Sequence, residues 1–303
     1  MNKNWMISII LTISLCFISL GSVVGAEGET SSSLEDEGSF TLLNYNVAGL
    51  WAPLSGSNPD KNTKKISALL NNYDIVTVQE NFNYHDELVS KVDHPYISKH
   101  DSVLGFGTGT GDGLTRLSMF KFKDFKRKEW KNCHGYFDQG SDCLTPKGFT
   151  FARHEVSEGV FVDVYNVHAD AGRNKDDLKA KEKNFKQVLE KVEKWSEGNA
   201  VIIAGDFNST YNYKKYKDGL RRFPDAGFTD VWAEFDNNGV IPGIDEKEVD
   251  GDRIEKIFYR SGKEVKLSID DYQYVTDVFV DEKGKDLSDH RPIYSKFSYR
   301  VVR

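Results

Sequence analysis

The stretch AVIIAGDFNST, residues 200–210, places an unbroken apolar run directly before Gly205, Asp206 and Asn208. A short continuous apolar run predicts a strand that is buried on both faces. Asp206 and Asn208 stand two residues apart, so in extended backbone their side chains point to the same side. The stretch therefore predicts a buried strand that ends in an acid and an amide, with Gly205 allowing a sharp turn of the backbone.

Similar short apolar runs recur on both sides of this stretch, and each predicts a further strand: residues 40–45, 74–78, 160–167, 254–259, 274–280 and 293–297. Three helices are predicted between them: 63–71 with Thr63 as N-cap, 84–92, and 175–196 with apolar residues at three- and four-residue spacing. Many strands, few helices and no shift in composition after residue 39 predict one α/β domain over residues 39–303. We expect two sheets packed face to face, with helices outside.

The first residues differ in kind from this domain. Residues 1–26 hold one charged residue, Lys3, then an apolar run and small residues up to Ala26, which is the pattern of a cleaved secretory signal peptide. The apolar run is shorter than the roughly 20 residues that span a bilayer, which argues against a membrane anchor. Residues 27–38 are polar and acidic, so we expect a disordered leader. The pattern predicts a secreted, extracellular protein with no integral membrane segment after cleavage.

The charge balance is acidic. The chain of 303 residues has 40 Lys and Arg against 47 Asp and Glu, a formal net charge of −7. An acidic protein gains no electrostatic help in approaching nucleic acid or anionic lipid. A bound metal ion can supply positive charge where a phosphate sits, so the net charge does not exclude phosphate substrates.

Two cysteines, Cys133 and Cys143, remain once the predicted signal peptide removes Cys16. The residues between them are rich in Gly and Asp. In an oxidising compartment we expect these two thiols to form a disulfide. Two free thiols or half of a zinc site are the alternatives, but no second Cys or His pair has the spacing of zinc ligands.

Polar side chains also close other predicted strands. Asn46 ends the run FTLLNYN and Glu80 ends DIVTVQE; a carboxylate at a strand end suits a hard cation such as Mg²⁺. His168 follows the run VFVDVYNV, and Asp289 precedes His290 in LSDHRPI. Two histidines in such positions fit acid–base catalysis or phosphate stabilisation. Taken singly, Glu80 could equally be the first solvated residue after a strand, and each histidine a structural one.

Together, the segments NYNVAGL, VTVQEN, YNVHAD, GDFNS and LSDHRPI resemble, in order and strand context, the motifs of the deoxyribonuclease-I-like endonuclease/exonuclease/phosphatase superfamily. The resemblance covers about residues 40–299. It implies a four-layered α/β sandwich, in which two packed, mainly antiparallel β-sheets are flanked by helices. It also implies in-line attack of water on phosphorus, supported by Mg²⁺ or another divalent cation such as Mn²⁺, Co²⁺ or Ca²⁺.

The resemblance implies a role for each matching residue. Glu80 would be the main metal ligand, Asn46 would lie close to metal and phosphate, and Asp289 would support the metal or the water. Asp206 would orient the attacking water, and Asn208 would donate hydrogen bonds to a phosphoryl oxygen.

His168 and His290 would act as an acid–base and charge-stabilising pair. The family also carries an acid on a strand before the last motif, which orients the second histidine. In DGDRIEKIFYRSG both Asp252 and Glu255 fit this position. Strand register favours Glu255, with Asp252 as the alternative.

Within the superfamily the chain most resembles secreted neutral sphingomyelinase-like phospholipases C, through its signal peptide and the segment CHGYFDQGSDCLTPKGFTF, residues 133–151. A phospholipid at a membrane surface is the substrate that this resemblance implies. Haemolytic bacterial members carry an aromatic-tipped hairpin before the last motif, whereas the stretch VDEKGKDLSDH, residues 280–290, is charged here. Lipid contact would then need another surface, with Phe106, Tyr136 and Phe137 as candidates.

Three other functions remain open. A secreted nuclease needs a basic surface, and FKFKDFKRKEWK, residues 120–131, is the one dense cluster, although a charged edge strand explains it equally well. A phosphatase for phosphoinositides or other small phosphate esters is the second. An inactive binding module is the third, and the intact set of polar residues argues against it. We expect a monomer.

Overall fold

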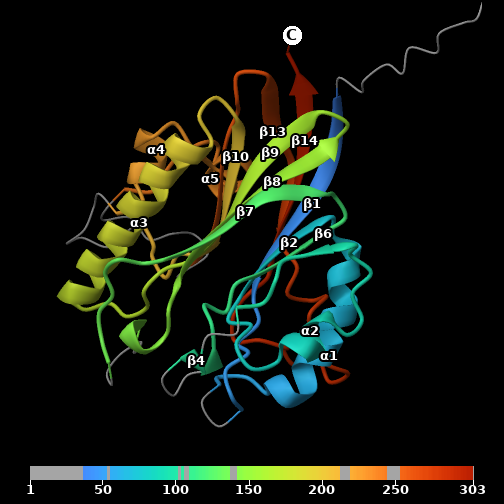
Figure 1. Ribbon diagram of the computed structural model, residues 1–303, viewed down its shortest axis with the longest axis vertical. Coiled ribbons are helices and arrows are strands. Elements are labelled where there is room, and N and C mark those ends of the chain that lie inside the picture. Colours follow the sequence, from blue (N-terminus) through green and yellow to red (C-terminus); the bar gives the residue numbers. More distant parts are fainter. Residues whose placement is uncertain are drawn as a thin grey trace, which may run out of the picture. The chain divides into compact units, whose positions relative to one another are not determined.

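The computed structural model describes residues 37–52, 55–101, 104–105, 109–136, 142–211, 219–243 and 253–302. The predicted signal peptide lies outside these residues, as do Phe106, Phe137 and Asp252. In the described part, two six-stranded sheets face each other and most of the helices lie on their outer sides (Figure 1). The predicted α/β sandwich of two mainly antiparallel sheets is confirmed. None of the described helices is long and apolar enough to span a bilayer.

The first sheet has the strand order β13 (Val265–Tyr274), β14 (Ile293–Val301), β1 (Glu37–Asn46), β2 (Ile75–Gln79), β6 (Thr115–Ser118) and β3 (Tyr96–Ile97). Only β1 and β2 are parallel; the other neighbours in this sheet are antiparallel. Its outer face is covered by α1 (Pro59–Leu69), a 3₁₀ turn (Leu70–Asn72) and α2 (His85–Val89). Ile66, Leu70 and Leu88 pack there against Val76 and Val78.

The second sheet has the order β11 (Thr229–Asp230), β12 (Glu255–Arg260), β10 (Ala200–Asp206), β9 (Val160–His168), β8 (Gly148–Ser157) and β7 (Phe122–Glu129). Here β9 and β10 form the parallel pair. Helices α3 (Lys175–Trp195) and α4 (Arg222–Asp225) pack on its outer face, whereas α5 (Val231–Asp236) contacts β12 of this sheet and β13 of the other. A separate two-stranded sheet of β4 (Leu104–Gly105) and β5 (Gly109–Thr110) and a 3₁₀ turn (Asp142–Leu144) lie in the loops.

The long helix α3 begins where the sequence predicts. The side chain of Asn174 accepts hydrogen bonds from the backbone N–H groups of Asp176 and Asp177, and the carboxylate of Asp177 accepts one from the backbone N–H of Asn174. This capping box satisfies N–H groups that have no partner within the helix. The buried side of α3 then packs Phe185, Val188 and others on the second sheet.

Several predicted boundaries are wrong. The strand predicted over residues 274–280 is wrong, because Tyr274 is the last residue of β13. Val275 and Phe279 are apolar for another reason: they pack into the apolar cluster beneath α1. Helix α1 begins at Pro59, four residues before Thr63, because proline suits the first helical position; the Thr63 hydroxyl instead donates to the carbonyl of Pro59.

Two residues assigned to the disordered leader belong to β1. Glu37 and Gly38 pair with Arg300 and Tyr299 of β14, so the neighbouring strand extends β1 beyond its apolar run. Gly205 does not form a turn. It lies within β10, and a Cβ atom there would meet the carbonyl oxygen of Val167 at 2.0 Å, so glycine is required by the close approach of β9.

The interface between the two sheets changes from apolar to polar along the strands. Side chains that face this interface alternate with outward ones, as extended backbone dictates. At one end they form an apolar cluster that includes Leu42, Ile75, Val164 and Ile202. Two residues further along, the inward positions of three strands are buried and polar, at Asn44, Thr77 and Asn166, while β10 still has Ala204. Four residues further along, all four strands have buried polar side chains: Asn46, Gln79, His168 and Asp206. The polar end coincides with the carboxyl ends of both parallel pairs.

Candidate active site

Four of the predicted site residues lie at the ends of four strands. Asn46 ends β1 and Glu80 follows β2, while His168 ends β9 and Asp206 ends β10. Asn46 is in register with Gln79, and His168 with Asp206. Because neighbouring parallel strands end at the same edge of a sheet, each sheet contributes two adjacent side chains.

The backbone leaves these strands in an unusual conformation. Ala48, Glu80 and Asn208 have φ angles of 49°, 58° and 49°, in the left-handed region that costs a side-chain-bearing residue about 1–3 kcal/mol. Hydrogen bonds hold this conformation: the N–H groups of Gly49 and Phe82 donate to the carbonyl of Glu80 at 3.0 and 2.9 Å. The strain sits at three chain segments that carry site residues, as is common where side chains are aimed for function.

Asn46 lies at the centre of the group. Its Nδ2 is 2.9 Å from Glu80 Oε1, 3.1 Å from Asp206 Oδ2 and 3.3 Å from His290 Nε2. Its Oδ1 accepts the N–H of Ala48 at 3.0 Å, which fixes the direction of the amide. One amide therefore joins side chains from both sheets and from the segment before β14.

His290 is held by Glu255. The distance from His290 Nδ1 to Glu255 Oε1 is 2.6 Å, and Asp206 Oδ2 lies 3.8 Å from the same ring nitrogen. Burial disfavours the charged ring, but the bond to Glu255 and the charges of Asp206 and Glu80 outweigh it and raise the pKa of His290 to about 10. The structure thus brings Glu255 to the position that strand register favours.

His168 is fully buried, and neither ring nitrogen has a hydrogen-bond partner among the described residues. Its Nε2 lies 3.8 Å from Glu80 Oε1 and 3.7 Å from Asp206 Oδ2. Burial lowers the pKa of His168 well below its ordinary range, and the positive charges of Lys147 and His290 lower it further. The ring is therefore neutral and can act as an acceptor or a ligand.

Glu80, His168 and Asp206 fit a divalent cation. One ligand atom from each lies within 4.8 Å of the others, in the one such group found among the described residues. Burial raises the pKa of Asp206, with His290 opposing and Glu255 adding to the rise. The two carboxylates are donors of the type that Mg²⁺ and Mn²⁺ accept, whereas the imidazole nitrogen suits a transition-metal ion better than Mg²⁺.

Two predicted site residues lie apart from this group. Asp289 is exposed, and its carboxylate covers Gly56, where an added Cβ atom would meet it. Asn208 is half-buried: its Nδ2 donates to the carbonyl of Ala169 at 3.1 Å, and its N–H donates to Asp206 Oδ1 at 2.8 Å. Asn208 thus fixes the carboxylate of Asp206 through its backbone.

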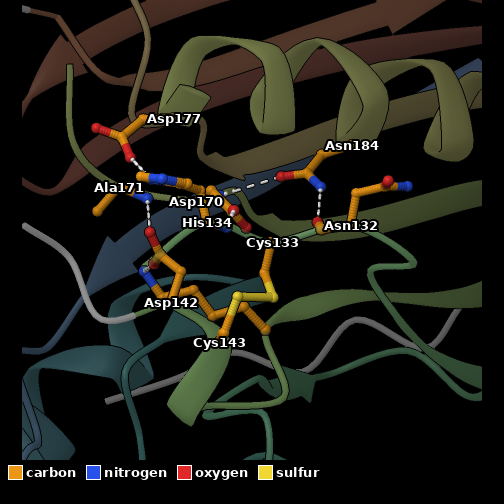
Figure 2. Close-up of a disulfide and its surroundings, with 10 residues drawn as sticks. Asn132, Cys133, His134, Asp142, Cys143, Asp170, Ala171, Asp177 and Asn184 are labelled. Atoms are coloured by element: carbon orange, nitrogen blue, oxygen red, sulfur yellow. Dashed lines mark hydrogen bonds and ion pairs between the residues drawn. A yellow bond between two sulfur atoms is a disulfide. The ribbon is translucent and has the colours of Figure 1, made fainter. Parts of the chain in front are cut away.

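The predicted disulfide is present, with 5.3 Å between the Cα atoms of Cys133 and Cys143. Figure 2 shows the bridge beside the segment that follows His168. The backbone N–H of His134 donates to Asp170 Oδ2 at 2.8 Å, and Ala171 donates to Asp142 Oδ2 at 2.7 Å. These two hydrogen bonds attach His134 and Asp142, which stand beside the two bridged cysteines, to the chain directly beyond His168.

Lys147 is a neighbour of the site for which no local pattern predicts a role. It is buried, and its Nζ lies 2.6 Å from Asp142 Oδ1. Burial opposes its charge, but Asp142 and Glu80 raise the pKa of Lys147, and Asp206 contributes. The signal in the sequence is a lysine directly before an apolar strand, which is common on surfaces and does not mark a buried charge.

The chain matches known proteins over most of its length. Residues 48–241 match Endonuclease/Exonuclease/phosphatase family 2. A sphingomyelinase of Mycobacterium tuberculosis is 35% identical over 271 residues, which are 86% of this chain and 53% of the relative. The chain thus spans about half the length of that curated relative.

Solved structures share the fold at lower identity. Beta toxin from Staphylococcus aureus with bound magnesium ions has a TM-score of 0.56 and 18% identity, and the match covers 85% of this chain and 99% of the toxin. D. rerio TDP2 in complex with a single-strand DNA product has a TM-score of 0.62 and 20% identity, with coverage of 86% and 98%.

Proposed function

Because the chain belongs to the endonuclease/exonuclease/phosphatase family, we propose that it is a divalent-metal-dependent phosphodiesterase that cleaves phospholipid head groups in the manner of a sphingomyelinase. The convergence of Asn46, Glu80, His168, Asp206 and His290 at one edge of the sandwich carries this proposal. The relative from Mycobacterium tuberculosis is named a sphingomyelinase, which supports a phospholipid substrate over other phosphate esters.

Glu80, Asp206 and His168 would hold the cation, with Mg²⁺ as the first candidate and Mn²⁺, Co²⁺ or Ca²⁺ as alternatives. When bound, such a cation supplies Lewis-acid stabilisation to the phosphoryl oxygens. The beta toxin with bound magnesium ions supports this choice.

The side chains of this chain divide the remaining work. Asp206 is buried and oriented by the N–H of Asn208, so it can accept a proton from the water that attacks phosphorus in line with the leaving oxygen. His290 carries a proton at neutral pH and can stabilise the negative charge that develops on the phosphoryl group. The amide of Asn46 would donate uncharged hydrogen bonds to the phosphate, and the exposed Asp289 would support the attacking water.

Secretion and contact with a membrane belong to the same proposal. A disulfide between Cys133 and Cys143 suits an oxidising compartment. The side chain of Tyr136 is 62% exposed in the loop that this disulfide closes, so it is available to an interface between lipid and water. The turn before His290 is charged and does not offer an aromatic tip.

The basic segment 120–131 supports a nuclease less well. It forms β7 at the edge of the second sheet, as the alternative of a charged edge strand predicts. The rings of Phe122 and Phe125 are half-buried, and Phe122 contacts Tyr96 and His154. Aromatic rings in such packing are not free to stack on bases.

The test compares the activity of the full chain on different phosphate esters. Three activities are measured with Mg²⁺, with chelator, and in His290→Ala: phosphocholine release from sphingomyelin vesicles, nicking of plasmid DNA, and phosphate release from soluble phosphoinositide head groups. Lipid turnover that disappears in the chelator and in the variant is the expected result. DNA nicking alone would replace the proposal with a nuclease, and release of phosphate from soluble phosphoinositide head groups alone would replace it with a phosphatase.

A further inference from the structure

The proposed metal site is divided between two sheets. Glu80 follows a strand of the first sheet, whereas His168 and Asp206 end strands of the second. Apolar contacts between sheets are non-directional, so they favour close packing without fixing one position along the strands. Directional contacts such as hydrogen bonds between the sheets must therefore hold Glu80 at the right distance from His168 and Asp206.

Asn166 makes such a directional contact. It lies on β9, two residues before His168, and its side chain is fully buried between the sheets. Its Nδ2 donates to the carbonyl of Val78 at 2.9 Å and to the carbonyl of Thr115 at 3.2 Å, both in the first sheet. One amide thus bonds the second sheet to two neighbouring strands of the first.

Gln79 completes the connection from the other side. It directly precedes Glu80 and is also fully buried. Its Nε2 donates to Asn166 Oδ1 at 2.7 Å and to Asn44 Oδ1 at 2.8 Å. The Gln79–Asn166 bond joins the residue next to Glu80 with the residue two places before His168, beneath the group that would hold the cation.

We propose that Asn166 and Gln79 are positioning residues that lock the two sheets in register at the metal site and so set its affinity for a divalent cation. The inference rests on the proposed metal-dependent function. Buried amides are costly unless hydrogen-bonded, so they are satisfied in one arrangement of the sheets and not in a shifted one. Ligand groups must be held within about 0.5 Å of their working positions, which apolar packing alone does not ensure.

The experiment measures Mn²⁺ binding by calorimetry on the full chain without substrate. Gln79→Met removes the amide and leaves the Asn166 bonds to Val78 and Thr115, while Asn166→Leu removes all three contacts. We expect each variant to bind Mn²⁺ about 10- to 100-fold more weakly, the range typical for partners that orient metal ligands. The double variant should be little weaker than Asn166→Leu, because both changes remove the same bond.

Thr77→Val is the matched control. Thr77 is a buried polar residue of the same strand, but its hydroxyl bonds to Asn44 and Leu43 within the first sheet. It should lower the melting temperature as Gln79→Met does, with Mn²⁺ affinity within twofold of the original chain.

Folded Gln79→Met with unchanged Mn²⁺ affinity would overturn the proposal, and so would equal weakening in Thr77→Val, which would indicate general destabilisation. If Asn166→Leu does not fold, Gln79→Met carries the test alone. Failure of the proposed function looks different: the original chain and Glu80→Gln would then bind Mn²⁺ equally weakly.

Discussion

Replacement of Glu255 by Gln is predicted to slow catalysis while leaving the fold intact. The two side chains have nearly the same shape, and Gln can still accept a hydrogen bond from His290 Nδ1, which lies 2.6 Å from Glu255 Oε1. The substitution therefore removes the negative charge and little else. Its effect isolates the charge that keeps the imidazole of His290 protonated.

The magnitude follows from the character of this bond. A hydrogen bond to a charged group contributes about 1.5–3 kcal/mol and a neutral one about 0.5–1.5, so removing the charge costs about 1–2 kcal/mol. That cost corresponds to a rate reduced about 5- to 30-fold.

The pH dependence has a definite sign. The pKa of His290 is raised to about 10, so its positive charge is present at neutral pH and is lost as pH rises through that value. Without the charge of Glu255 the pKa of His290 falls, and the alkaline loss of activity moves to lower pH.

The assay measures the rate of sphingomyelin hydrolysis in both proteins from about pH 5 to about one pH unit above the pKa of His290, together with an NMR titration of His290 in metal-free protein. Glu255→Asp is the control, because it keeps the charge on a shorter side chain and should keep the alkaline limb near its original position. A rate within twofold of the original and an unshifted titration in Glu255→Gln would refute this account of His290.

Three further predictions concern the cation, the disulfide and the close contact of β9 with β10. Mg²⁺ should raise the melting temperature of the original chain in a thermal scan and not that of Glu80→Gln, since a ligand stabilises the state that binds it; equal shifts would exclude Glu80 as a ligand. Cys133→Ser should lower the free energy of unfolding in urea by about 2–3 kcal/mol, as expected for a loop of this size, and reductant should have no further effect on the variant. Gly205→Ala should cost about 3 kcal/mol or more, because its Cβ would meet the carbonyl of Val167, and a soluble variant of unchanged stability would contradict that contact.

The sequence predicted the elements whose apolar pattern is long and regular. The strand over 200–204 and the helix over 175–196 were predicted because an unbroken apolar run and apolar residues at three- and four-residue spacing are properties of neighbouring residues, and β10 and α3 match them. The strand β13 and the true start of α1 were missed. The strand β13 depends on pairing with β14, which lies further along the chain. The start of α1 depends on Pro59, whereas the nearby Thr63 is the residue that resembles an N-cap.

The identity of the site residues could be predicted because they stand in motifs at strand ends, but their geometry could not. Asn46, Glu80, Asp206 and His290 come together only when two sheets stack, across separations in sequence of up to 244 residues. The same stacking leaves Asp289 exposed beside Gly56, which no local pattern indicates.

Local sequence by itself determined which strands end in polar side chains, because alternation along a strand is a short-range property. The tertiary structure alone decided that Lys147 is buried near Glu80, and that Asn166 and Gln79 bond across the sheets. In the sequence these are ordinary polar residues within or beside apolar runs. Burial and pairing depend on which surfaces meet, and that is a property of the packed sheets.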